Sequence, residues 1–150
     1  MERKYRIGID AGTSALKAAI IDRDGKTVAT GEQKLELLRQ GVRVEMDAIK
    51  FRDALFGLLA RVAAPYAQEI IGIAISGAAG STLMLDGAGK PSEIISWLDE
   101  RTIGNVPKCL SGISNMDLRR CTGWPCLDCF PLAHIAWWQA NQGERIKAAS

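Results

Sequence analysis

Residues 8–17 read Gly-Ile-Asp-Ala-Gly-Thr-Ser-Ala-Leu-Lys, and this stretch decides how the chain begins to fold. It lies between an alternating apolar strand, residues 5–10, and a second apolar strand, residues 16–22. An Asp-Gly pair then predicts a hairpin into a third strand, residues 27–33. Short turns between consecutive strands predict an antiparallel meander. A strand after the glycines also excludes the P-loop and the dinucleotide-binding loop, because both need a helix there.

The turn between the first two strands has the chemistry of a phosphate site. Successive backbone N–H groups in a tight turn bind an anion, and Gly12 lets the backbone approach it closely. Thr13 and Ser14 add hydroxyl donors. Asp10 repels phosphate unless Mg²⁺ lies between them, held through water, and Lys17 would offset the remaining charge. The same residues also fit an ordinary hairpin with a surface aspartate, and the turn alone does not separate the two interpretations.

The middle of the chain predicts a helix and two more strands. A loop with Gly41 leads to a helix over residues 48–64, with Asp47 as its cap and Pro65 at its end. The side chains expected on its buried face are Ile49, Phe51, Leu55, Leu58, Leu59 and Val62. Residues 69–76 have the continuous apolar character of a buried strand.

The last part of the chain predicts short elements. After a second glycine turn come a strand and a short apolar segment, at residues 81–85 and 94–98. Helices are expected over residues 100–110, 115–121 and 131–139. A final helix begins at Glu144 and has no stop signal, which predicts that the chain continues beyond Ser150 in a longer protein.

Charge and hydropathy favour a small-molecule function. The net charge is +2 and the basic residues form no run, so nothing supports binding to nucleic acid. No apolar run is long enough for a signal peptide or a bilayer span, which predicts a cytoplasmic protein without a membrane partner.

The cysteines allow two interpretations. Cys121, Cys126 and Cys129 have the spacing C-x4-C-x2-C, with Cys109 upstream, which is compatible with zinc or an iron–sulfur cluster. No second CxxC accompanies them, and the only histidine, His134, lies in an apolar helix. Free thiols are therefore favoured over a metal site.

Three segments, in order, resemble one family. GIDAGTSALKAAIIDRDGK, residues 8–26, is similar to the opening of the FGGY carbohydrate kinases, G-I-D-x-G-T-[ST]-x-x-[KR]. IIGIAISGAAGSTLMLDGAGKPSEIISWLDERT, residues 70–102, resembles the family's strand–turn–strand followed by W-x-D-x-R. CTGWPCLDCFPLAHIAWW, residues 121–138, resembles its T-G-x-P…F…K-x-x-W helix. The resemblance covers residue 5 to about residue 150.

The resemblance implies a fold and an activity. It implies an α/β fold of the actin-like ATPase superfamily, with a ribonuclease-H-like core and a mixed sheet that starts with the three-strand meander. It implies ATP-dependent phosphorylation of a sugar or polyol hydroxyl with Mg²⁺. Residues 1–150 would form the N-terminal part of the first kinase domain, without the second, adenosine-binding domain. The catalytic base, an aspartate, would lie downstream of residue 150, so the 150-residue chain alone is expected to be inactive.

The resemblance also assigns residues to two sites. It assigns binding of the ATP phosphate to Asp10, Gly12, Thr13, Ser14 and Lys17, and binding of Mg²⁺ to Asp10. It assigns binding of the substrate to Gly77, Ala78, Ala79, Gly80, Trp97, Asp99, Arg101 and Cys129. Trp97 stands where glycerol kinases pack a tryptophan on the substrate, although a core tryptophan is the alternative. Asp99 and Arg101 either contact substrate or pair with each other, and pairing is slightly favoured.

Departures from the family pattern concern the substrate. Xylulokinases carry Gln-Met-His in the second turn and glycerol kinases Gln-Arg-Glu, where this chain has Ala78-Ala79-Gly80. Cys129 replaces a tyrosine of glycerol kinases, and His134 stands where lysine is common. Without the polar side chains the turn cannot select particular hydroxyls, so we expect a bulkier substrate that is neither glycerol nor xylulose.

Two other functions remain open at this stage. A non-kinase ATPase of the same superfamily would have a similar glycine turn, although the W-x-D-x-R segment argues against it. A degenerate scaffold or binding protein would be consistent with the lost polar side chains. A homodimer is also open, because a face normally covered by further polypeptide would favour self-association.

Overall fold

The computed structural model describes residues 4–104, 112–125 and 127–149. The chain divides into two compact units, which are described separately below. The first contains residues 1–36 and 49–78, and the second contains residues 37–48 and 79–150.

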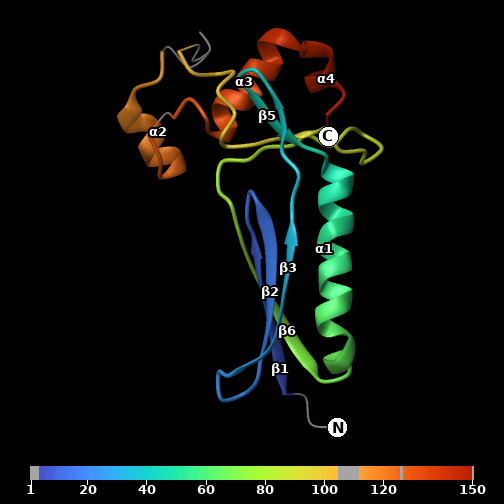
Figure 1. Ribbon diagram of the computed structural model, residues 1–150. Coiled ribbons are helices and arrows are strands. Elements are labelled where there is room, and N and C mark those ends of the chain that lie inside the picture. Colours follow the sequence, from blue (N-terminus) through green and yellow to red (C-terminus); the bar gives the residue numbers. More distant parts are fainter. Residues whose placement is uncertain (1–3, 105–111, 126, 150) are drawn as a thin grey trace. The chain divides into compact units, whose positions relative to one another are not determined.

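A four-stranded mixed sheet forms the first unit, in the order β3-β2-β1-β6 (Figure 1). Its strands are β1 (Tyr5–Ala11), β2 (Ala15–Ile21), β3 (Thr27–Lys34) and β6 (Ile70–Gly77). β1, β2 and β3 pair antiparallel, whereas β6 runs parallel to β1. The structure therefore confirms the predicted meander and the mixed sheet that begins with it.

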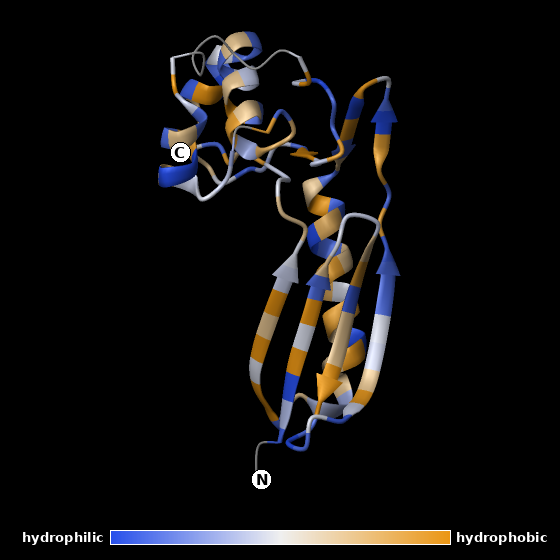
Figure 2. Cartoon of the chain, turned by 90° about the vertical axis from the view of Figure 1, so that its left-hand side faces the viewer, coloured by the Kyte–Doolittle hydropathy of each residue, from blue (hydrophilic) through white to orange (hydrophobic). Residues whose placement is uncertain are grey.

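Helix α1 (Ala48–Ala63) covers one face of this sheet, and the short helix η1 (Ala64–Tyr66) follows it. Figure 2 shows α1 behind the strands. The core side chains are Ile7, Ile9, Leu16, Ala18 and Ile20 from the sheet and Leu58 and Val62 from α1. The prediction that Ile49 lies on the buried face of this helix is wrong, because Ile49 is exposed. Phe56, seven residues later, is exposed as well. Both lie on the side of the helix turned away from Leu58.

Strand β6 corrects the prediction of a buried strand at residues 69–76. Ile73 and Ile75 are 59% and 66% exposed, respectively, and only Ile70 packs against the core. The reason is position: β6 is the last strand of the sheet among the described residues, and the apolar side chains of α1 pack over the other three. Continuous apolar sequence predicted the strand correctly but not what covers it.

The second unit contains a hairpin that replaces the predicted loop around Gly41. β4 (Leu38–Gln40) pairs with β5 (Arg43–Met46), and β5 pairs with β7 (Ile94–Ile95). Gly41 has a φ of +58°, which a two-residue hairpin turn requires at this position. The predicted strand at residues 81–85 is also wrong, because only isolated bridges, such as Thr82 to Ile95, form there.

The described residues of the second unit form three helices, and all three were predicted. They are α2 (Asn115–Thr122), α3 (Pro131–Asn141) and α4 (Gly143–Lys147). The Ser114 hydroxyl caps α2, and Gly123 ends it with a φ of +79°. α4 ends at Lys147, so the helix expected from Glu144 to the end of the sequence is shorter than predicted.

The predicted helix over residues 100–110 is only partly described. Residues 101–104 form turns instead of a helix, and the rest of the segment lies outside the described residues. No helix in the described ranges combines the length and apolar character needed to cross a membrane.

Candidate functional site

The first glycine turn, residues 12–14, connects β1 directly to β2. A Cβ atom added to Gly12 would lie 2.9 Å from the carbonyl oxygen of Ala15, closer than real Cβ contacts allow. Glycine is therefore needed at position 12 because the backbone there passes close to the Ala15 carbonyl, and not because of a positive φ. The Leu35 N–H donates to the Ser14 carbonyl at 2.9 Å, which ties the turn to the end of β3. The turn is thus compact and held on both sides.

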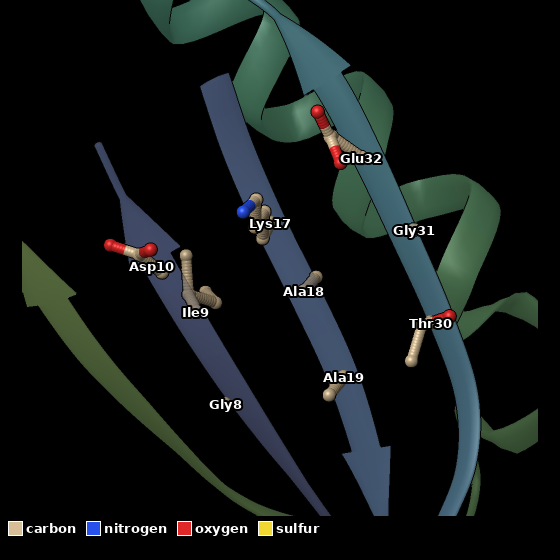
Figure 3. A pocket seen from close by; sticks show the side chains of 9 residues that line it. All are labelled: Gly8, Ile9, Asp10, Lys17, Ala18, Ala19, Thr30, Gly31 and Glu32. Atoms are coloured by element: carbon tan, nitrogen blue, oxygen red, sulfur yellow. The ribbon is translucent and has the colours of Figure 1, made fainter. Parts of the chain in front are cut away.

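A row of charged side chains crosses the open face of the sheet beside this turn. In register, Asp10 of β1 faces Lys17 of β2, and Lys17 faces Glu32 of β3. Figure 3 shows these three side chains along adjacent strands, at one end of a cavity of about 560 Å³ that continues past Ala19 and Thr30. These three side chains lie on the face of the sheet that is turned away from α1. The buried residues that alternate with them along the strands lie on the face that α1 covers.

The charges of this row fit a magnesium–phosphate group better than a bare phosphate. Asp10 and Glu32 contribute two negative charges and Lys17 one positive charge, so the row is net negative. A phosphate beside it needs an additional cation, and carboxylate oxygens with several waters are what Mg²⁺ prefers. Glycine at position 12 lets the turn close tightly, and successive backbone N–H groups of a tight turn can bind an anion.

The second glycine turn starts beside the first. Ala11 at the end of β1 pairs with Gly77 at the end of β6, because these neighbouring strands are parallel. The Ala78 N–H donates to the Ala11 carbonyl at 3.1 Å. Two successive segments of the predicted site therefore leave the same edge of the sheet, and the second continues into the other unit at Ala79.

Within the second unit, three of the predicted substrate residues meet. Gly80 has a φ of +89°, and a Cβ placed there would lie 3.0 Å from Cβ of Trp97 and 3.6 Å from the Cys129 carbonyl. Trp97 is 42% exposed, so the described residues do not bury it. Its backbone N–H donates to the Ser81 hydroxyl at 3.4 Å. The structure thus gathers Gly80, Trp97 and Cys129, which are far apart in sequence, with an exposed indole among them.

Asp99 and Arg101 pair with each other. Arg101 donates two hydrogen bonds to the Asp99 carboxylate, at 2.7 and 2.6 Å, and a third to Glu45 at 2.5 Å. The Val44 N–H donates to Asp99 at 2.7 Å. Asp99 is wholly buried, so its side chain has no surface to offer a ligand in this conformation. Arg101 also stacks over the Trp137 ring, 5.0 Å from its centroid.

This network keeps both of its partners charged. Burial alone raises the pKa of Asp99, but the hydrogen bonds from Arg101 and from the Val44 N–H outweigh it, so the pKa lies below its ordinary value. Burial likewise lowers the pKa of Arg101, and the two carboxylates reverse this and raise it. The network ties the segment after Trp97 to β5.

His134 holds helix α3 to the segment that carries the second turn. Its Nδ1 lies 2.9 Å from the Thr82 hydroxyl, and Thr82 exchanges backbone hydrogen bonds with Ile95. His134 is wholly buried, and its Nε2 finds no hydrogen-bond partner among the described residues. Burial lowers its pKa to about 4, so the imidazole is neutral at pH 7.

The metal interpretation of the cysteines finds no support in the described part of the chain. Cys121 and Cys129 are free thiols, and no group of three or more metal-ligating side chains occurs among the described residues. Cys109 and Cys126 lie outside the described residues.

Comparison with known proteins identifies the family. Residues 5–150 match the FGGY family of carbohydrate kinases, N-terminal domain. The chain belongs to the FGGY family. This FGGY chain is 31% identical to the xylulose kinase of Lactococcus lactis subsp. lactis over 146 residues, which cover 93% of the chain and 29% of that kinase. It is 28% identical to the glycerol kinase of Carboxydothermus hydrogenoformans over 155 residues, which cover 99% of the chain and 31% of the kinase.

Solved structures show the same fold. The xylulose kinase of Rhodospirillum rubrum superposes with a TM-score of 0.86 at 18% identity, over 97% of the FGGY chain and 31% of the other. The predicted actin-like ATPase fold is thereby confirmed. The FGGY chain spans about a third of the length of these relatives.

Sequence reasoning missed several residues of the FGGY chain that line or support these sites. Glu32 and Thr30 line the cavity beside Asp10, and alternation along the third strand would have placed them on its open face. Glu45 and Thr82 bond to Arg101 and His134, respectively. No local signal marks those two contacts, because each joins segments about 50 residues apart.

Proposed function

We propose that this chain supplies the phosphate turn and part of the sugar-binding wall of an ATP-dependent kinase that phosphorylates a hydroxyl of a sugar or polyol. The observation that carries the proposal is the Gly12 turn beside the row of Asp10, Lys17 and Glu32. A turn that excludes a Cβ, next to a net negative row, suits a phosphate accompanied by a divalent cation. Membership of the FGGY family supports the same activity.

In this proposal each residue of the turn has a binding role. Backbone N–H groups of residues 12–14 and the hydroxyls of Thr13 and Ser14 bind phosphate oxygens of ATP. Asp10 holds Mg²⁺ through water, and Lys17 balances charge beside it. The bound Mg²⁺ supplies neutralisation of the charge that develops on the transferred phosphoryl group.

The second unit receives the sugar. The exposed face of Trp97 suits the C–H side of a polyol, and the methyl side chains of Ala78 and Ala79 leave space beside the second turn. The attacking hydroxyl bonds to the γ-phosphorus while the bond to the ADP oxygen breaks. Its proton passes to a general base that the family resemblance assigns beyond residue 150.

The substrate in this proposal is neither glycerol nor xylulose and is bulkier at the end that faces the second turn. The support is the absence of hydrogen-bonding side chains at Ala78 and Ala79 and the thiol at Cys129. A site without such groups does not penalise analogues that lack a particular hydroxyl. Efficient turnover of glycerol or xylulose would contradict this.

The decisive experiment couples ADP release to a panel of ketoses, polyols and aldoses with Mg·ATP, using the complete gene product. Asp10→Ala should lower kcat by about a hundredfold or more, because it removes a group aimed at the charge of the transition state. Asp53→Ala, at an exposed pair with Arg52 on α1, is the matched control and should leave kcat unchanged. Silence across the panel by a folded protein that still binds Mg·ATP would favour the non-kinase ATPase or the scaffold.

A further inference from the structure

A short ladder of backbone hydrogen bonds places Trp97 opposite Gly80. Thr82 and Ile95 form an antiparallel bridge, in which the N–H of each donates to the carbonyl of the other, at 2.9 and 2.8 Å. Along an antiparallel pair the numbers fall on one segment as they rise on the other, so the same register brings Gly80 opposite Trp97. A Cβ added at Gly80 would lie 3.0 Å from Cβ of Trp97, as this register requires. The segment that contains Thr82 therefore sets the position of the indole.

The start of helix α3 contacts the same segment. The Cys129 carbonyl lies 3.6 Å and a ring carbon of Phe130 3.7 Å from the place of a Cβ at Gly80. One turn further along α3, the His134 N–H donates to the Phe130 carbonyl, and the His134 Nδ1 lies 2.9 Å from the Thr82 hydroxyl. The imidazole is thus a polar link between α3 and the segment that lies opposite the indole.

The surroundings of His134 single out this hydrogen bond. The side chain is wholly buried, and within the described part of the chain only its Nδ1 has a hydrogen-bond partner. A buried nitrogen left unpaired, as Nε2 is there, costs free energy that a leucine or methionine of similar size would avoid. A side chain that only filled this place in the core would therefore be apolar, and the presence of an imidazole points to its bond with Thr82.

We propose that His134 is a positioning residue of the sugar site, which through its hydrogen bond to Thr82 holds the indole of Trp97 against the start of α3. This role rests on the proposed function, because it requires that the sugar packs on the indole. A sugar that contacts both groups loses affinity when they separate. Mg·ATP, whose phosphates the Gly12 turn would bind, should not be affected.

Steady-state kinetics of the complete gene product, with the best sugar of the panel, tests this difference between the two substrates. Thr82→Val removes the hydroxyl and keeps the shape of the side chain, whereas His134→Leu removes both ring nitrogens. Each variant should raise the KM for the sugar by about tenfold and leave the KM for Mg·ATP unchanged. The double variant should raise the KM for the sugar no further than either single variant, because both remove the same bond.

His134→Asn is the conservative variant that should rescue the site. Burial lowers the pKa of His134 to about 4, so a neutral amide is the appropriate replacement at pH 7. The Asn amide can donate or accept near the place of Nδ1 and should keep the KM for the sugar within about threefold of the wild type. Val62→Ala is the control for lost stability, because it removes buried methyl groups from the core of the other unit, and it should leave both KM values unchanged.

Fluorine NMR of protein labelled with fluorotryptophan tests the position of the indole without a kinase assay. The Trp97 signal is assigned by its disappearance in Trp97→Phe. It should shift or broaden in Thr82→Val and in His134→Leu, and it should return toward its wild-type position in His134→Asn. Silence across the sugar panel would refute the proposed function, whereas this signal would still decide whether His134 positions the indole.

Three results would overturn the proposal. The first is an unchanged KM for the sugar together with an unchanged Trp97 signal in Thr82→Val. The second is a KM for Mg·ATP that rises in parallel with the KM for the sugar, which would show a general structural role. The third is a double variant in which the effects of Thr82→Val and His134→Leu multiply, since the two side chains would then act independently.

Discussion

Gly31 on β3 shows how a single missing Cβ sets the distance between helix and sheet. A Cβ there would lie 2.5 Å from Cγ2 of Val62 and 2.9 Å from Cδ1 of Leu58, both buried side chains of α1. Gly31→Ala should therefore lower the free energy of unfolding by about 1–3 kcal/mol through overpacking. Urea unfolding of the variant measures this. Gly72→Ala, where nothing lies within 4 Å of the added Cβ, is the control and should cost far less.

His134 makes stability depend on pH in a defined window. Its folded-state pKa of about 4 lies below the ordinary 6.5, so the unfolded chain binds the proton more readily. The contribution of neutral His134 to the free energy of unfolding is complete above pH 6.5. It is lost as the pH falls toward 4, and the loss is about 3 kcal/mol at most. Because His134 is the only histidine in the sequence, its titration can be followed by NMR as a single imidazole signal.

The comparison variant for this prediction is His134→Gln, which does not titrate in the same range. The pH dependence of its unfolding free energy between pH 6.5 and 4 should be flatter than that of the wild type. If the two proteins showed the same pH dependence, or if the imidazole of the folded protein titrated near pH 6.5, the inference that His134 is buried in its neutral form would be wrong.

At the scale of elements, a buried network joins the W-x-D-x-R segment to β5: Asp99 accepts a hydrogen bond from the Val44 N–H, and Arg101 pairs with both Asp99 and Glu45. Asp99→Asn keeps an acceptor for the Val44 N–H but removes the charge opposite Arg101, whose side chain is only 6% exposed. Removing one partner of a buried pair costs about 3–5 kcal/mol when the other charge is left uncompensated, and because Glu45 still pairs with Arg101 the loss should lie near the lower end of this range. Chemical denaturation should therefore show a large loss of stability.

The exposed pair Arg52–Asp53 provides the scale for this effect. Its side chains are more than half exposed, so Asp53→Asn should cost about 1 kcal/mol or less. If Asp99→Asn were as mild as Asp53→Asn, the network would not be what holds this segment to β5.

Elements also differed in how far sequence could predict them. α1, the meander and α2 to α4 have strong local signals: alternation, helical spacing, and caps such as Ser114 and Gly123. The β4–β5 hairpin was missed because β4 is three exposed residues, and β5, although Val44 and Met46 are buried, is too short at four residues to show a clear alternation. For the site, the Gly12 turn and its neighbours could be predicted, whereas the partners of Arg101 could not.

At the scale of the whole molecule, the chain spans about a third of the kinases it matches. We expect no sugar-dependent ADP release from the purified 150-residue chain with Mg·ATP, because the adenosine site and the general base are expected outside it. The same coupled assay and sugar panel apply. Robust turnover by this chain alone would mean that a base and a nucleotide site lie within residues 1–150.

The sequence by itself determined the meander, helix α1, the places of α2 to α4 and the tight Gly12 turn, because periodicity and turn formation depend on neighbours a few residues apart. Only the tertiary structure decided which surfaces are covered and which distant groups meet. It left Ile73 and Ile75 exposed at an edge, gathered Gly80, Trp97 and Cys129, and buried Asp99 against Arg101. The physical reason is that burial and hydrogen-bond pairing depend on what packs against a side chain, and local sequence does not specify that.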